Sequence, residues 1–358
     1  MSAKFVLRTL RNVVFRDRPY FAQLAITHRC NLRCRFCRIW QEEYDELDTK
    51  GVKRVIDVFD SLGAAVVSIS GGEPLLRRDL PTILDYAGDK GLHTRVSTNG
   101  TVSLKRYAEL LKSGIMEINL SVDGVRGNDL PYSHIGPKIL RTIRYLNDNL
   151  PPKKRLTLSV TVSQANQDRV EEIVDFCAKE YPKAGIWLKP ITVGVGKLRT
   201  ATEEKVNPEF LRRCKSPALL YLEFYNQAVE DYYRADIYDW GCRAGRTFFE
   251  VKPNGDFWLC NDVPPRTPLN VLDPDFKSKL RKADFSYRRE CGGCVYSCYF
   301  IAQKGFEPRN WDQLAILWWL VNTQRGERCR DIAGKHGWFP GLLSFCADRT
   351  LGLFRRVN

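Results

Sequence analysis

The sequence lacks any uninterrupted apolar run of about 18 residues, the length at which a transmembrane helix becomes a candidate. Its longest candidate stretch, LAILWWLV at 314–321, is far shorter. The N-terminal segment MSAKFVLRTLRNVVFRDRP interleaves arginines with apolar residues, whereas a signal peptide has a continuous hydrophobic centre and a small-residue cleavage site. We therefore expect a cytoplasmic protein without a membrane span.

Low-complexity tracts and short internal repeats are also missing, and histidine is scarce, with 4 residues in 358. Hydrophobic residues make up 44% and charged residues 27%, which is typical of a globular protein with a sizeable core. Acidic residues are outnumbered, 42 against 56 Lys and Arg, giving a net charge of +14. This excess fits nucleic acid, an anionic membrane surface or an acidic substrate, and does not choose among them.

Cysteine, in contrast, is abundant, with 12 residues. Disulfide frameworks belong to small secreted domains, and this sequence shows no secretory signal. In a reducing compartment, clustered cysteines are more often metal ligands. The cysteine clusters are therefore candidate metal sites.

Apolar, strand-like stretches alternate with amphipathic, helix-like ones over the first 200 residues. The predicted strands are 20–27, 64–70, 93–98, 116–122, 155–162 and 185–191, and the clearest helices are 47–63, 103–114 and 166–181. Repeated strand–helix units predict a parallel sheet with crossover helices, either barrel-like or doubly wound. In both arrangements the ligand site lies at the carboxyl ends of the strands. The alternation stops near residue 200, where we expect a domain boundary.

The first cysteine cluster, CNLRCRFC, begins just after the first predicted strand and contains Cys30, Cys34 and Cys37. A structural zinc site needs a fourth ligand nearby, and His28 does not have a common zinc spacing. Three unrelated buried cysteines are a second interpretation. The third is an iron–sulfur cluster in which one iron lacks a protein ligand and binds a cofactor or substrate.

The sequence CNLRCRFC resembles the C-x3-C-x-aromatic-C motif of the radical S-adenosylmethionine (radical SAM) superfamily. The resemblance extends to SISGGEPLLR at 68–77, STNG at 97–100 and NLSVDG at 119–124, in that order, and covers roughly residues 20–200. It implies a [4Fe–4S] cluster with one open iron site, held by Cys30, Cys34 and Cys37. It also implies contacts of Phe36 with the adenine, and of Gly71, Gly72, Glu73 and Pro74 with the methionine amino group of SAM. Ser97, Asn99, Ser121 and Asp123 are candidates for ribose or carboxylate contacts, with helix capping as the alternative for each.

The cofactor supplies the chemistry that this resemblance implies. A reduced cluster donates an electron to SAM, and the 5′-deoxyadenosyl radical that results abstracts a hydrogen atom from the substrate. The electron source is expected to be a reductant such as flavodoxin or ferredoxin. Acid–base residues are secondary in such a reaction, which suits a chain with 4 histidines.

A second group of cysteines follows residue 200. The segment FFEVKPNGDFWLC at 248–260 predicts a hairpin with an Asn-Gly turn, and ECGGCVYSC supplies a C-x2-C pair with a further cysteine. This pattern resembles the twitch domain, the shortened form of the SPASM extension of radical SAM enzymes. The resemblance implies one auxiliary [4Fe–4S] cluster held by Cys242, Cys260, Cys291 and Cys294, with Cys298 as a possible substitute. A structural zinc in the same thiolates is the alternative.

The predicted fold is α/β: a partial (β/α)6 TIM-like barrel with a small C-terminal α+β twitch/SPASM-like domain. Its segments are a basic amphipathic N-terminal segment at 1–19, the core barrel at 20–200, the auxiliary-cluster domain at 201–305, and a basic, Trp-rich C-terminal segment at 306–358. Val6, Leu10, Val13 and Val14 fall on one helical stripe among arginines. This pattern favours either contact with an anionic membrane surface or packing on the barrel.

The sequence thus predicts a radical SAM enzyme, peripheral on the inner face of the membrane, with a lipid or isoprenoid substrate. A peptide or protein maturase is the alternative, followed by a sugar or small-molecule oxidoreductase. A non-catalytic zinc- or nucleic-acid-binding protein is the alternative from another class. The GGEP loop disfavours it, because a zinc-knuckle protein has no use for that loop, and we expect no nucleic-acid partner.

Overall fold

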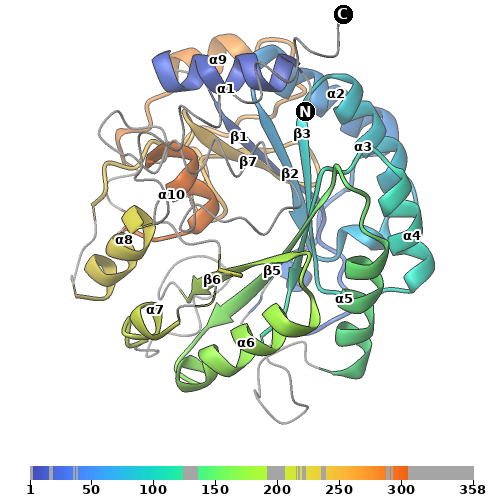
Figure 1. The fold of residues 1–358 in the computed structure, drawn as a ribbon. Coiled ribbons are helices and arrows are strands. Elements are labelled where there is room, and N and C mark those ends of the chain that lie inside the picture. The colour runs from blue at the N-terminus through green and yellow to red at the C-terminus, as the bar shows by residue number, and fades with distance from the viewer. Residues whose placement is uncertain are drawn as a thin grey trace, which may run out of the picture.

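The computed structural model describes residues 3–15, 19–34, 37, 39–123, 136–191, 206–214, 216, 218–219, 223–234, 239–287, 291 and 293–304. Its centre is an 8-stranded sheet in the order β6-β5-β4-β3-β2-β1-β7-β8 (Figure 1). Neighbouring strands from β6 to β7 are parallel, and β7 and β8 form an antiparallel hairpin. The first six strands follow chain order without a reversal, so the sheet is the barrel-like alternative and not the doubly wound one.

The strands are β1 (Phe21–Thr27), β2 (Val66–Gly71), β3 (His93–Thr98), β4 (Glu117–Ser121), β5 (Arg155–Val162), β6 (Ala184–Pro190), β7 (Phe248–Val251) and β8 (Phe257–Trp258). The helices are α1 (Ala3–Phe15), α2 (Thr49–Leu62), α3 (Leu80–Asp89), α4 (Leu104–Lys112), α5 (Pro137–Asn149), α6 (Val170–Glu180), α7 (Phe210–Arg213), α8 (Glu223–Arg234), α9 (Phe276–Lys282) and α10 (Ser297–Lys304). The six strands predicted before residue 200 and the predicted hairpin are confirmed. None of the helices in the described part of the chain is long and apolar enough to cross a membrane.

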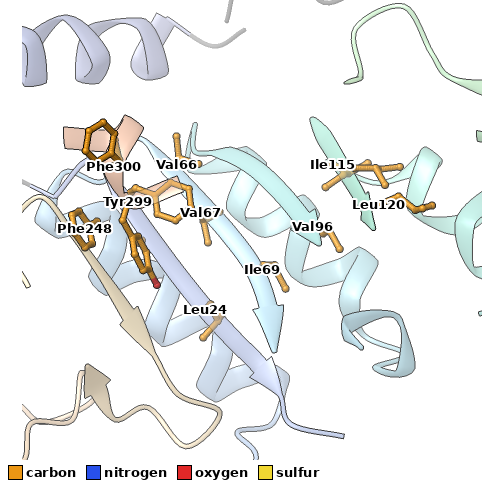
Figure 2. Packing of buried hydrophobic residues seen from close by; sticks show 14 of the residues in the cluster. Leu24, Val66, Val67, Ile69, Val96, Ile115, Leu120, Phe248, Tyr299 and Phe300 are labelled. Carbon is orange, nitrogen blue, oxygen red and sulfur yellow. The ribbon is translucent and has the colours of Figure 1, made fainter. Parts of the chain in front are cut away.

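The outer face of the sheet is apolar and lies under the crossover helices. Leu24, Val67, Ile69 and Val96 project from neighbouring strands into this layer (Figure 2). Burying such side chains is the main source of stability of the barrel wall. The carboxyl ends of the strands therefore have fixed positions on a rigid wall.

The inner face of the same strands is polar. One row of register partners crosses six strands and consists of Glu250, Gln23, Ser68, Arg95, Glu117 and Arg155. Its members bind one another: Gln23 Nε2 donates to Glu250 Oε2 at 2.6 Å, and Arg95 Nε lies 3.1 Å from Glu117 Oε1. The barrel interior is thus lined by hydrogen-bonding groups and charges.

Helix α1 covers the N-terminal ends of the strands. Phe5 packs on His93 with ring centroids 5.2 Å apart, and Thr9 hydrogen-bonds Tyr20. The barrel-facing side of α1 includes buried polar residues because the interior that it covers is polar. Val6, Leu7 and Leu10 are exposed instead, so neither Val6 nor Leu10 packs on the barrel. The side chains of Val13 and Val14 lie outside the described residues.

Helices α8 and α10 close the side of the partial barrel between β6 and β7 (Figure 1). On β6, Trp187 packs on Tyr225 of α8 at 5.6 Å, and on β7, Phe248 stacks on Tyr299 of α10 at 4.5 Å. The Tyr225 hydroxyl donates to the carbonyl of Val295 at 3.0 Å and so joins α8 to the segment before α10. The region after residue 200 therefore contributes both a strand and a wall to the barrel.

Candidate functional site

The first cysteine cluster lies on the loop that leaves β1, at the carboxyl end of the sheet. Arg29 Nη2 lies 3.0 Å from Glu46 Oε2 and ties the start of this loop to the segment before α2. The Cys37 amide donates to the carbonyl of Cys34 at 3.1 Å, which turns the chain between these two thiols. Phe36, the predicted adenine contact, lies outside the described residues.

The three thiols lie within electrostatic range of one another. Cys30 interacts with Cys37, and Cys34 interacts with both. Burial, and after it the neighbouring thiols, raises the pKa of Cys34 to about 12, and burial also raises the pKa of Cys30. A metal cation among these sulfurs favours the thiolates and reverses this effect. The donor set therefore suits a cationic iron centre.

The glycines after β2 pack directly on the cysteine loop. The Gly72 amide donates to the carbonyl of Thr27 at 2.7 Å, and the Glu73 amide donates to the carbonyl of Arg29 at 2.9 Å. A Cβ on Gly71 would lie 2.1 Å from the Thr27 oxygen, and one on Gly72 would lie 2.2 Å from the Arg29 oxygen. These glycines therefore admit the backbone that carries the thiols, and the predicted contact of this loop with the methionine amino group of SAM stays a prediction.

Glu73 joins the ends of β2 and β3. Its carboxylate accepts from the amides of Leu75 at 3.1 Å and Asn99 at 2.8 Å, and from the Thr98 hydroxyl at 3.0 Å. Burial raises its pKa to about 7 despite these donors. Pro74 follows it and begins a short 3-10 turn, Pro74–Leu76. Within the described residues, Glu73 acts as an internal connection between two strand ends.

Asn99 connects the end of β3 to the cysteine loop. Its Nδ2 lies 3.8 Å from Cys30 Sγ and donates to Asn31 Oδ1 at 2.9 Å, while its Oδ1 accepts from the Thr101 amide at 2.9 Å. Asn99 therefore both caps the local turn and touches a cluster thiol. Two residues earlier, Ser97 is partly exposed on the inner face, where Asn119 Nδ2 lies 3.4 Å from its Oγ.

The end of β4 carries the last two predicted cofactor contacts. Ser121 is partly exposed on the inner face, in register with Ser159. Asp123 is buried, accepts from the Thr161 amide at 3.1 Å, and lies within electrostatic range of Cys34. Burial raises the pKa of Asp123 to about 6. The four motifs thus meet at one end of the sheet, and their contacts with SAM stay predictions.

The second group of cysteines gathers around Cys294. This thiol lies within electrostatic range of Cys242, Cys291 and Cys260. Burial raises the pKa of Cys294, and it also raises the pKa of Cys260 well above its ordinary value. These four residues are the predicted auxiliary ligands, although they come from three separate segments of the chain.

Gln303 of α10 and Gly245 hold two of these segments together. Gln303 Oε1 accepts from the Arg243 amide at 2.7 Å, and its Nε2 donates to the Gly241 carbonyl at 2.9 Å, so it binds both neighbours of Cys242. The Gly245 amide donates to the carbonyl of Leu259 at 3.0 Å, beside Cys260. Gly245 has a φ of +80° and leaves no space for a side chain against Phe285.

Cys298 has different surroundings. It interacts with Arg95 of β3 and Lys189 of β6, on the inner face of the barrel. Tyr225 and Tyr296 interact with both Cys298 and Cys294, so Cys298 lies between the barrel interior and the other auxiliary cysteines.

Among the described residues, no three His, Cys, Asp or Glu side chains have the spacing of a formed metal site. The fit of both thiol groups to iron therefore rests on their donor chemistry and their electrostatic proximity. The sequence did not single out Arg95, Thr98 or Lys189, because each becomes part of the site only through contacts between strands. Their alternating positions on predicted parallel strands were the available signal.

Comparison with known proteins gives the following matches. The Radical SAM superfamily matches residues 24–177. AdoMet-dependent heme synthase from Nitratidesulfovibrio vulgaris is 31% identical over 311 residues, covering 76% of this chain and 83% of that protein. PqqA peptide cyclase from Bradyrhizobium diazoefficiens is 35% identical over 276 residues, covering 70% of this chain and 69% of that protein.

Fe-coproporphyrin III synthase from Methanosarcina barkeri is 31% identical over 159 residues, which are 43% of this chain and 40% of that relative, so the match spans less than half of its length. Among solved structures, Streptococcus suis SuiB bound to S-adenosylmethionine has a TM-score of 0.59 at 19% identity, covering 79% of this chain and 69% of that one. At this identity the likeness concerns the fold.

Proposed function

Because the chain belongs to the radical SAM superfamily, we propose that it cleaves S-adenosylmethionine reductively at a [4Fe–4S] cluster held by Cys30, Cys34 and Cys37. The observation that carries this proposal is the close packing of Gly71 and Gly72 on residues 27–29. Side chains larger than hydrogen would separate the cysteine loop from the strand end where the family binds SAM.

The chain's own residues position the reactants. Cys30, Cys34 and Cys37 would each hold one iron of the cluster, which would leave the fourth iron open for SAM. Glu73 and Asn99 fix the β2 and β3 ends relative to Cys30. When bound, the cluster and SAM supply a reductive carbon–sulfur cleavage and the radical that takes a hydrogen atom from the substrate. The barrel wall encloses that chemistry.

We assign a second cluster to Cys242, Cys260, Cys291 and Cys294, because these thiols share one electrostatic neighbourhood and Cys298 faces the barrel. A closed set of four ligands suits an electron-transfer centre. The external electron donor is a reductant such as flavodoxin or ferredoxin.

The substrate is proposed to be polar. The relatives include a heme synthase and a peptide cyclase, and the inner face presents serines, threonines and charges. A lipid chain would displace water from the partly exposed polar residues of this face, such as Arg95, Ser97 and Ser121, at a cost of roughly 1–3 kcal/mol for each group left without a hydrogen-bond partner. We therefore propose a polar substrate in place of the lipid that the basic ends of the chain favoured.

The exposed face of α1 is proposed to contact anionic membrane peripherally, since Val6, Leu7 and Leu10 are exposed on a helix that also carries Lys4 and Arg11. Co-sedimentation with phosphatidylglycerol vesicles tests this. The variant L7S/L10S is expected to lose binding, and L7V/L10V, which keeps both exposed side chains apolar, is the control. Equal sedimentation of wild type and L7S/L10S would contradict the proposal.

Anaerobic reconstitution tests the main proposal. We expect about eight irons per chain and SAM cleavage to 5′-deoxyadenosine on reduction with dithionite. Cys30→Ala should lose about four irons and the cleavage, whereas Cys294→Ala should lose about four irons and keep the cleavage. Stoichiometric zinc with no SAM cleavage would overturn the proposal in favour of a zinc-binding protein.

A further inference from the structure

The inner face of the barrel is not uniformly buried. Along β3 to β6 most residues are buried, and the partly exposed ones fall on the inner face: Arg95, Ser97, Ser121, Thr161, Gly185, Trp187 and Lys189. Register pairs join them, since Ser121 is level with Ser159 and Trp187, and Thr161 is level with Lys189. The partly exposed residues thus form one continuous surface, and Cys298 of α10 lies within electrostatic range of two of them, Arg95 and Lys189.

Cations are in excess on the described inner surface around Arg95. Arg95 and Arg155 flank a single carboxylate, Glu117. Although burial opposes it, Arg95, His93 and Arg155 hold the pKa of Glu117 at about 2, so Glu117 stays anionic. Burial lowers the pKa of His93, which is therefore neutral near pH 7. Two guanidinium groups and one carboxylate leave one positive charge around Arg95, whereas on β6 the Lys189 ammonium lies within electrostatic range of a second carboxylate, Asp123.

The guanidinium of Arg95 is available for a ligand. Its Nε lies 3.1 Å from Glu117 Oε1 in an ion pair that lacks hydrogen-bond geometry, and none of the hydrogen bonds in the described part of the chain uses its terminal nitrogens. The side chain keeps 15% of its surface exposed in an otherwise buried row. A planar guanidinium with free N–H groups is the donor that best matches a carboxylate.

Lys189 supplies a second cation on the other side of the same thiol. Cys298 lies within electrostatic range of both Arg95 and Lys189. The two cations come from β3 and β6, strands that are separated by β4 and β5, and α10 brings Cys298 between them. Arg95 is level with Arg155 and Lys189 is level with Thr161, so the two cations stand six residues apart along the strands and each acts on Cys298 from a different direction.

We propose that Arg95 and Lys189 form an anion-binding subsite beside Cys298 that receives a carboxylate of the substrate. As a substrate subsite it rests on the proposed function, because the carboxylate anchors the molecule from which the radical takes hydrogen. As an anion site it does not depend on turnover. Tetrapyrrole propionates and acidic peptide side chains present the same carboxylate chemistry.

Alkylation of Cys298 in the reconstituted, anaerobic holoenzyme tests the site without a known substrate. Iodoacetate and iodoacetamide react with the same thiolate, which displaces iodide and forms a thioether. The thiol pKa affects both rates equally, so the ratio of the iodoacetate rate to the iodoacetamide rate reports the attraction of the anionic reagent. We expect this ratio, measured by peptide mass spectrometry, to exceed that of glutathione by about tenfold.

Arg95→Gln and Lys189→Gln should each lower the ratio several-fold, and Arg95→Lys should retain most of it. Arg144→Gln, which removes the same charge from an exposed ion pair with Glu180, should leave it unchanged. A ratio equal to that of glutathione, or one unchanged in Arg95→Gln and Lys189→Gln, overturns the proposal. Alkylation of Cys298 only after iron removal also overturns it, because the thiol would then be a cluster ligand.

Protection experiments distinguish the sources of the carboxylate. If coproporphyrin III slows the iodoacetamide reaction and its tetramethyl ester does not, the subsite binds a tetrapyrrole carboxylate. If a glutamate-containing peptide protects Cys298 and its glutamine analogue does not, the subsite binds a peptide carboxylate. Equal protection by charged and neutral forms counts against a carboxylate site. If the holoenzyme does not cleave SAM but shows the expected ratio of alkylation rates, the proposed function fails and the anion subsite stands.

Discussion

At Gly72, a methyl group would stand 2.2 Å from the carbonyl oxygen of Arg29, a backbone atom that cannot rotate away. Gly72→Ala should therefore push the cysteine loop off the β2 end. We expect a loss of roughly 1–3 kcal/mol in the free energy of unfolding. Iron at the first cluster should fall, with the second cluster retained, as measured by iron content and electron paramagnetic resonance.

Gly88 provides the matched control for this substitution. It lies within α3, and a Cβ there would be 3.7 Å from the nearest atom, the Gly114 oxygen. Gly88→Ala should leave iron content unchanged and slightly raise stability, since alanine favours a helix over glycine. If Gly72→Ala behaves in the same way, packing of the GGEP loop on the cysteine loop does not organise the site.

Glu117 makes stability depend on acid pH. Its pKa falls from the ordinary 4.5 to about 2 in the folded chain. The corresponding stability is present above pH 4.5 and is lost as the pH falls toward 2, about 3 kcal/mol in all. Urea unfolding between pH 7 and pH 2 should show this loss in the wild type, with a flatter profile in Glu117→Gln.

Glu109→Gln is the control for this pH dependence, because Glu109 forms a surface ion pair with Arg106 and should contribute little. Its acid profile should follow that of the wild type. A Glu117→Gln profile as steep as that of the wild type would show that Glu117 is not held anionic by Arg95 and Arg155.

Among the elements, α10 binds the Cys242 loop through one side chain. Gln303→Leu keeps a similar volume but leaves the Arg243 amide and the Gly241 carbonyl without their partner. We expect a loss of roughly 1–3 kcal/mol in the free energy of unfolding for each unsatisfied group. The second cluster should also bind iron less tightly, measured by its rate of loss to a chelator.

Gln227→Leu is the corresponding control on α8, where an exposed glutamine binds only Asp231 in the described structure. Its second cluster should resist the chelator as the wild type does. Equal iron loss from both variants would mean that Gln303 does not position Cys242.

Element type was predictable wherever the pattern was local. The strand of residues 93–98 and the hairpin around Gly255 follow from β-branched residues and an Asn-Gly turn, and both are present. The pairing of β7 with β1 was not predictable, because 227 positions separate Gln23 from Glu250. The role of Gly72 was hidden for the same reason: its close neighbour, Arg29, belongs to another strand end.

On the scale of the whole molecule, the sheet unites the two halves of the chain. Phe21 is level with Phe248, and Tyr299 packs on both rings. A fragment of residues 1–200 would expose this surface and leave β1 as an open edge. We expect that fragment not to unfold cooperatively in urea, followed by circular dichroism.

The fragment 1–304 is the control, since it retains β7, β8 and α10, and it should show one transition with coincident circular dichroism and tryptophan fluorescence. A cooperative transition in 1–200 alone would instead show that the barrel is independent of the second region.

Helix α10 begins three residues after Cys294 and forms part of the barrel wall. If Cys294 holds the second cluster, iron delivery during biosynthesis also builds the chamber in which the substrate sits. Chains made under iron limitation would then be unable to bind substrate, and not merely unable to turn it over. Supplying electrons would not rescue them, whereas restoring iron–sulfur assembly would.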